Sequence, residues 1–139
     1  MIAVGGSPGF PADIDCSVAD FKTPADIKWV RNAAGTNESA VLFGDPSKPG
    51  PYMVINRFLP GNFSRPHFHP NDRFIMVLRG TWWVGTGPKY DTNNTVPMPA
   101  GTFVTHYGKG IHYDGAKDDE VHVLISGMGP ATSTPAEQK

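Results

Sequence analysis

Short segments in which apolar and polar residues alternate run along most of this chain. They are rich in Val, Ile, Phe, Thr and Trp, and clusters of Gly, Pro, Asn and Asp separate them, which is the pattern of many short strands joined by tight turns. Strands are expected at residues 40–43, 52–59, 64–69, 73–79, 81–85, 102–106, 110–113 and 121–126. Strands in this number and at this spacing predict an all-β sandwich or barrel.

The segments between and around these strands have the composition of loops and extensions. Residues 44–51 and 86–94 are expected to be loops, and Thr23-Pro24-Ala25-Asp26 reads as the start of at most one helical turn, although a strand beginning at Ile27 remains equally open. From Gly127 onward the chain is expected to be a mobile tail. We therefore divide the chain into an N-terminal extension (1–22), one barrel domain (23–128) and a C-terminal tail (129–139).

Length and charge exclude several classes of protein. A chain of 139 residues is typical of one domain, and its net charge of −1 comes from scattered basic and acidic residues, so nucleic acid and anionic membranes are not expected as partners. The longest apolar run, 74–78, is too short to span a bilayer, and residues 1–10 lack the features of a secretory signal. The single Cys16 forms no internal disulfide and is given no role. The compartment stays open: cytoplasmic as the sequence stands, periplasmic if a signal segment precedes it.

The candidate metal ligands are the five histidines of the chain, at positions 67, 69, 106, 112 and 122. The tripeptide His67-Phe68-His69 falls in an expected strand, and because side chains alternate across a strand, both imidazoles leave from the same face and can converge on one ion. The tripeptide alone leaves a metal pair and two unrelated histidines equally open.

The surroundings of this tripeptide resemble the cupin family. The first cupin motif is matched in spacing by Gly61, His67, His69, Arg73 and Gly80, with Arg73 where the family has Glu. The second motif is matched in spacing by Gly101, Tyr107, Lys109, His112 and Ala116, of which only the Gly and the His are the family's residues. The resemblance covers roughly residues 52–128 and implies a double-stranded β-helix, or jelly-roll, barrel to which the N-terminal region adds extra strands.

The resemblance also implies a metal site. Its imidazole ligands would be His67, His69 and His112. His106 competes for the third place because it follows Pro99-Ala100-Gly101, which looks like part of the second motif, but the Gly-to-His spacing favours His112. A structural or surface role is expected for His122 in the last strand.

Arg73 is the most informative departure from the family pattern. A guanidinium has no free lone pair, so this position cannot supply the usual carboxylate ligand. A three-histidine site is expected unless the neighbouring Asp72 replaces it; an Asp72 in a turn or paired with an arginine is equally open. An inward Arg73 would add a positive group that holds a carboxylate or enolate, whereas an outward one would form a solvated salt bridge.

Three neutral ligands would leave the full charge of a divalent ion and at least one open position, which describes a Lewis-acid site. Resemblance to three-histidine cupins implies a dioxygenase-like enzyme, with Fe(II) in function and Zn or Ni as metals acquired on purification, acting on a small enolisable or acidic compound. Arg73, His106 and Tyr107 are the catalytic candidates. A non-catalytic ligand- or metal-binding module and a sugar isomerase or epimerase, which needs a His–Asp base pair, remain alternatives. The resemblance further implies a homodimer.

Overall fold

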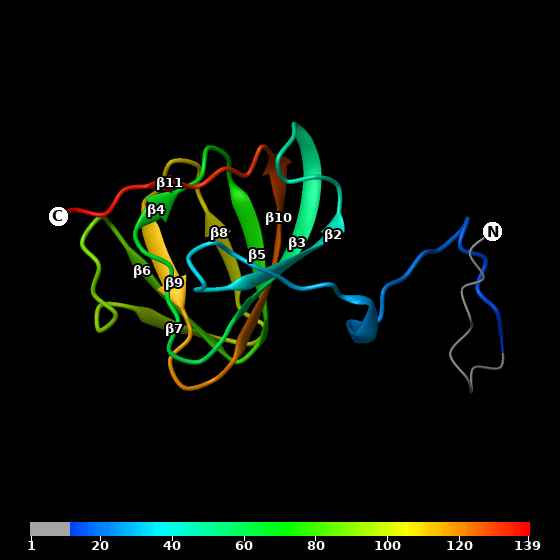
Figure 1. The fold of residues 1–139 in the computed structure, drawn as a ribbon, viewed down its shortest axis with the longest axis horizontal. Helices are drawn as coiled ribbons and strands as arrows, with labels where there is room; N and C mark the ends of the chain where they lie inside the picture. Colours follow the sequence, from blue (N-terminus) through cyan, green and yellow to red (C-terminus); the bar gives the residue numbers. More distant parts are fainter. Residues whose placement is uncertain (1–11) are drawn as a thin grey trace.

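The computed structural model describes residues 12–139 and consists almost entirely of β-strands (Figure 1). Residues 1–10, for which the sequence predicts no secretory signal, lie outside this range. The elements are η1 (Pro24–Asp26), β1 (Val30–Arg31), β2 (Glu38–Phe43), β3 (Gly50–Phe58), β4 (His67–Phe68), β5 (Arg73–Arg79), β6 (Thr81–Thr86), β7 (Val96–Pro99), β8 (Phe103–His106), β9 (His112–Gly115), β10 (Val121–Gly129) and β11 (Thr134–Pro135). No helix among the described residues is long and apolar enough to cross a membrane.

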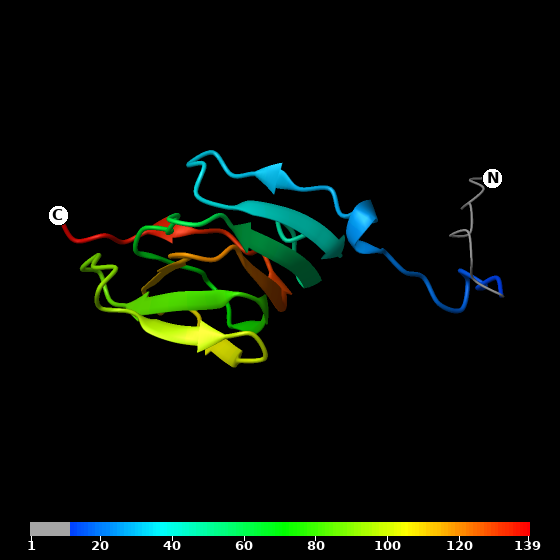
Figure 2. The same cartoon turned by 90° about the horizontal axis from the view of Figure 1, so that it is seen from below.

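Two antiparallel sheets face each other across one core (Figure 2). The first has the strand order β1-β2-β3-β10-β5-β8 and the second has the order β11-β4-β9-β6-β7. From β3 onward, strands that follow one another in sequence lie in different sheets, except β6 and β7, so the chain passes from sheet to sheet as it winds. At the β5–β6 corner Gly80 has φ of +73°, and a Cβ there would overlap the carbonyl of Glu120. This winding is that of the expected double-sheet jelly roll.

The core follows directly from the alternation of side chains along each strand. In β10, Val121, Val123 and Ile125 are buried, whereas the intervening residues point to the other side of the sheet. The buried core consists of Tyr52, Phe58, Ile75, Val77, Trp82, Val84, Ala116, Val121, Val123 and Ile125. Of the two adjacent tryptophans, Trp82 is fully buried and Trp83 is only half-buried, as opposite faces of one strand require.

The N-terminal region lies largely apart from the two sheets. Residues 12–28 extend away from them, and the single turn η1 is capped by Asp26, whose carboxylate accepts a hydrogen bond of 2.8 Å from the backbone N–H of Thr23 (Figure 1). The expected single helical turn is confirmed. The chain first meets the barrel at Trp29, whose ring lies 4.2 Å from the guanidinium carbon of Arg57.

All eight expected strands are present with shifted ends, β1 belongs to the extra N-terminal strands that the resemblance implied, and β7 and β11 were not expected. The segment expected at 64–69 is reduced to β4, His67–Phe68, and β1, β7 and β11 are additional. β7 contains Pro97 and Pro99, which argue against a strand in sequence. It forms nonetheless because it lies at the edge of its sheet and pairs only with β6, where the missing N–H groups are tolerated.

The prediction of a loose tail from Gly127 is wrong. β10 continues to Gly129, and β11 then pairs with β4, placing Pro135 opposite His67. Beyond it, the carboxylate of Glu137 accepts a 3.0 Å hydrogen bond from Nε of Arg65. This segment is rich in Thr and Pro and shows no apolar alternation, so its sequence does not predict a strand. It forms one because it pairs with β4, which is distant in sequence.

The adjacent tryptophans provide a test of this packing. Trp82→Phe should lower the free energy of unfolding by about 2 to 3 kcal/mol, because it removes buried volume and the indole N–H that donates to the buried carboxylate of Asp114 at 3.0 Å. Trp83→Phe, the control on the opposite face, should cost less than about 1 kcal/mol. Urea unfolding of the metal-free proteins measures both, and equal losses would contradict this assignment of the core.

Candidate metal centre

Three histidines meet on the inner side of the five-stranded sheet. His67 in β4 is the direct antiparallel partner of His112 in β9, and His69 follows immediately after β4 on the same face as His67. One ring nitrogen of each lies within 4.8 Å of the corresponding atoms of the other two. The strand pairing therefore brings together residues that are more than forty positions apart in sequence.

The three imidazoles are oriented in the same way. Nδ1 of His67 lies 2.7 Å from the carbonyl oxygen of Arg65, and Nδ1 of His112 lies 3.0 Å from that of Gly110. Nδ1 of His69 lies 3.0 Å from the carbonyl of Thr132. Because a carbonyl only accepts, each Nδ1 must carry the proton and donate it, which leaves the lone pair on Nε2.

These lone pairs have no protein partner. Nε2 of His69 and Nε2 of His112 are buried and make no hydrogen bond within residues 12–139. Buried polar atoms are normally satisfied, so two convergent orphan acceptors need an explanation. Neutral imidazoles that donate from one nitrogen to a carbonyl and present the other inward are the arrangement of metal-bound histidines. The residues present thus fit a divalent metal ion.

Burial keeps two of the three imidazoles in their neutral form. Burial, together with the nearby positive charge of Arg73, lowers the pKa of His69 to about 3. Burial also lowers the pKa of His112 to about 4, although the carboxylate of Asp114 opposes this shift. Both imidazoles are therefore neutral at pH 7, which is the state that binds metal.

A buried carboxylate, Asp114, adjoins the histidines and was missed in the sequence analysis. It lies two residues after His112 in β9, accepts a hydrogen bond of 2.5 Å from Oγ of Ser64 and a second from Nε1 of Trp82. Burial opposes its ionisation, but the surrounding histidines and the Ser64 hydroxyl lower its pKa overall. The signal was present in sequence, since His112-x-Asp114 has the same two-residue period as His67-x-His69.

His106 is also buried in the barrel, but it does not belong to the converging set. Its ring centroid lies 3.9 Å from that of His112 and 5.4 Å from the ring of Trp82. Neither of its ring nitrogens has a hydrogen-bond partner in the described part of the chain, and burial lowers its pKa. The structure thus groups His112, and not His106, with His67 and His69.

Two other candidate residues, Asp72 and Tyr107, do not belong to the group of three imidazoles. Asp72 is exposed, and its Oδ1 accepts a 2.7 Å hydrogen bond from the backbone N–H of Gly108, so it takes the turn role left open in the sequence. Tyr107 is 72% exposed. Unlike these, Arg73 points into the barrel.

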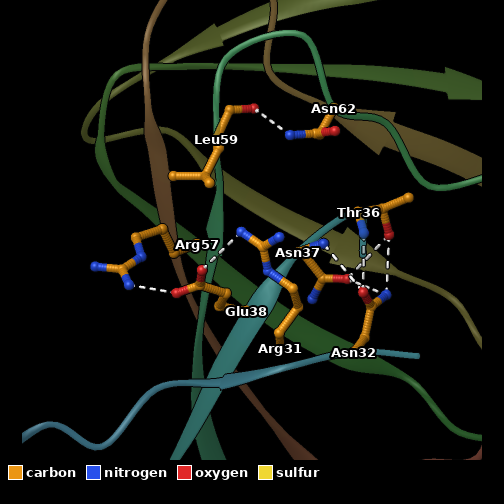
Figure 3. A network of polar contacts seen from close by, with 8 residues as sticks. All are labelled: Arg31, Asn32, Thr36, Asn37, Glu38, Arg57, Leu59 and Asn62. Carbon is orange, nitrogen blue, oxygen red and sulfur yellow. Dashed lines mark hydrogen bonds and ion pairs between the residues drawn. The ribbon is translucent and has the colours of Figure 1, made fainter. Parts of the chain in front are cut away.

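A cavity of about 390 Å³ opens beside the three histidines. Its lining residues are Asn32, Ala34, Thr36, Asn37, Asn56, Phe58, Ser64, Arg65, Pro66, His67, His69, Arg73, Asp114, Ser133 and Pro135. The turn between β1 and β2 forms part of this wall, and Figure 3 shows how the side chain of Asn32 braces it by donating to Thr36 and Asn37 at 2.9 and 2.6 Å. The extra N-terminal strands therefore complete the wall of the cavity.

Solved structures of known proteins share the fold of this chain. No family model and no curated protein matches the sequence. Among solved structures, the polyketide cyclase RemF from Streptomyces resistomycificus has a TM-score of 0.71 at 17% identity, covering 86% of this chain and 87% of its own. A cupin-2 domain from Rhodospirillum rubrum has a TM-score of 0.58 at 17% identity, covering 87% and 77%. The chain has the cupin fold.

The cupin fold does not by itself assign an activity. A sugar phosphate isomerase of the cupin superfamily from Silicibacter pomeroyi has a TM-score of 0.59 at 21% identity, covering 76% of this chain and 73% of its own. A cyclase and an isomerase thus share the fold with this chain. Function must be argued from the site itself.

The depressed pKa values predict a pH-dependent stability of the metal-free protein. The unfolded chain takes up protons on His69 and His112 near pH 6.5, whereas the folded protein does so only at about pH 3 and 4. Stability should therefore be complete above pH 6.5 and fall as the pH decreases from there toward 4, by up to about 1.4 kcal/mol per pH unit for each histidine. Urea unfolding across this range measures the slope. His112→Asn should reduce it, and an unchanged slope would show that burial does not hold this imidazole neutral.

Proposed function

We propose that this protein is a metal-dependent enzyme that holds a divalent ion through His67, His69 and His112 and acts on a small molecule in the adjoining cavity. The observation that carries this proposal is the pair of buried, unpartnered Nε2 atoms of His69 and His112, which converge with the third imidazole. A backbone carbonyl lies within hydrogen-bond distance of Nδ1 of each ring, so each ring is oriented with Nε2 toward the other two.

Three neutral ligands define the chemistry that the site supports. A divalent ion bound here would keep its full charge and at least one open position, and so act as a Lewis acid toward a bound oxygen atom. Arg73 stands where the cupin motif has a carboxylate, and Asp72 is engaged at a turn, so neither fills the open position. The protein's own part is to orient the imidazoles and shape the cavity beside them.

Within this class, we propose an oxygenase that uses Fe(II) on an enolisable or acidic compound. Imidazoles also bind Zn and Ni, which are expected as metals acquired on purification. Among the catalytic candidates, Arg73 lines the cavity, whereas His106 and Tyr107 do not. His106 packs against His112 and is best suited to positioning that ligand.

The alternative of a sugar isomerase or epimerase has less support. That chemistry needs a histidine paired with a carboxylate as base. The one buried carboxylate among the described residues, Asp114, is hydrogen-bonded through its side chain to Ser64 and Trp82 and to no histidine. A non-catalytic metal- or ligand-binding module shares the same site and differs only in the absence of turnover.

Metal content tests the site directly. Wild-type protein should carry about one ion per chain after reconstitution with Fe(II) or Zn(II), and His112→Ala should reduce this at least about tenfold because it removes one of three ligands. His122→Ala is the matched control, since His122 lies outside the site and interacts with Glu120. Elemental analysis measures all three. Metal-free wild type after reconstitution would refute the proposal. With Fe(II) bound, oxygen consumption with acetylacetone and with acetoacetate separates an oxygenase, which consumes oxygen with at least one of them, from a binding module, which consumes none.

We also propose that the protein forms a homodimer through the outer face of β5 and β8. β5 is apolar on both faces: Ile75 and Val77 are buried in the core, whereas Phe74 and Met76 are 47% and 37% exposed. Phe103 of β8 lies opposite Met76 and is 59% exposed. A strand that is apolar on both faces is typical of one covered on both sides, and a two-fold pair covers this patch with its own copy.

Sedimentation analysis tests the dimer. Phe74→Glu should shift the wild-type dimer toward monomer, because a charge in the centre of an apolar interface is costly to bury. Val18→Glu, a change at an exposed apolar residue of the N-terminal extension, should leave the mass unchanged. A monomeric wild type would refute this part of the proposal.

A further inference from the structure

Arg73 projects into the interior of the barrel from the first position of β5. It lies on the same face of the strand as Ile75 and Val77, both of which are in the core. Its side chain lines the cavity together with His67 and His69. A permanent positive charge therefore stands in the same cavity as the metal-binding set.

This charge has no ion-pair partner among residues 12–139, and the carboxylate of Asp114 acts on it only beyond ion-pair distance. Among residues 12–139 the guanidinium makes no ion pair or hydrogen bond, and its Nε is buried without a partner. The carboxylate oxygens of Asp114 are bonded to Ser64 and Trp82. Burial raises the pKa of Tyr52, so this nearby phenol stays neutral. A buried charge without a partner is unfavourable, which is the property of a group that waits for a ligand.

The charge balance of the cavity favours an anion. Burial keeps His69 and His112 neutral at pH 7, and the cavity is lined by the cation Arg73 and the carboxylate Asp114, whose charges cancel. A divalent ion then leaves the site strongly positive. The other arginine of the wall, Arg65, is already paired with Glu137. One free guanidinium matches a carboxylate, whereas a phosphate group is normally held by several cationic or N–H donors.

We infer that Arg73 selects substrates that carry a carboxylate, which it binds through the two parallel N–H donors of its guanidinium. The rest of the substrate then lies toward the three histidines, and this second half of the inference rests on the proposed metal centre. The carboxylate gives the guanidinium a directly hydrogen-bonded counter-ion. Arg73 is thus a specificity-determining residue in a position where the cupin motif supplies a metal ligand.

Paired ligands test this role without turnover. Acetoacetate and acetylacetone are both enolisable and similar in size, but only acetoacetate carries a carboxylate. Isothermal titration of the zinc-loaded protein should show that Arg73→Met weakens acetoacetate at least about tenfold and changes acetylacetone by less than about twofold. The acetoacetate affinity of Arg73→Lys should fall between those of wild type and Arg73→Met, because lysine keeps the charge but lacks the two parallel N–H donors. Arg79→Met is the matched control: the same substitution in the same strand, at an exposed residue that faces Glu120.

The outcomes separate this inference from the proposed function. If all variants bind zinc and Arg73→Met leaves acetoacetate binding unchanged, or weakens both ligands equally, the carboxylate role is refuted and the metal centre stands. Wild type that binds no acetoacetate also refutes it. If no variant binds zinc, but acetoacetate binding to the EDTA-treated protein still depends on Arg73, the metal proposal fails and the carboxylate role stands. Should Arg73→Met fail to fold, Arg73→Lys is compared with Arg79→Met instead. A greater loss of acetoacetate affinity in Arg73→Lys supports the carboxylate role, and an equal loss refutes it.

Discussion

The antiparallel pairing of β4 with β9 is the constraint on which the rest of the site depends. It places His67 directly opposite His112, and the two-residue period of β4 then brings His69 to the same face. β4 is only two residues long, so it cannot hold this register alone. β11 pairs with its other edge, and β6 pairs with the far side of β9. The short strand that holds His67 is thus fixed between two strands from later parts of the chain, β9 and β11.

The interior of this barrel is unusually polar around that pairing. His106 and Asp114 are buried beside the three converging imidazoles, and Trp82 contacts both of them. Such a cluster is costly to bury unless its members satisfy one another or a ligand. Asp114 is satisfied by protein donors, whereas Nε2 of His69, Nε2 of His112 and both ring nitrogens of His106 have no partner among the described residues. Of these unsatisfied nitrogens, those of His69 and His112 converge with the third imidazole, that of His67.

The replacement of a carboxylate by Arg73 changes the character of the cavity rather than only its ligand count. With a carboxylate ligand, a bound divalent ion would be partly neutralised by the protein. Here the protein adds a positive charge beside the ion, and Asp114 offsets only one unit of it. Neutralisation is then left to the molecule that enters the cavity. The proposed selection of an anion would thus follow from the same residue that takes the place of a metal ligand in the motif.

What the sequence determined by itself is local. The two-residue alternation predicted the eight principal strands and placed His67 and His69 on the same face of one of them, because both depend on strand geometry. The chemistry of the guanidinium alone excluded Arg73 as a metal ligand. Tertiary structure alone decided that β11 is a strand, that Arg73 faces inward, that Asp114 joins the cluster and that His106 stands behind His112. These features depend on which distant strand lies alongside, and that pairing is set by the closure of the barrel as a whole.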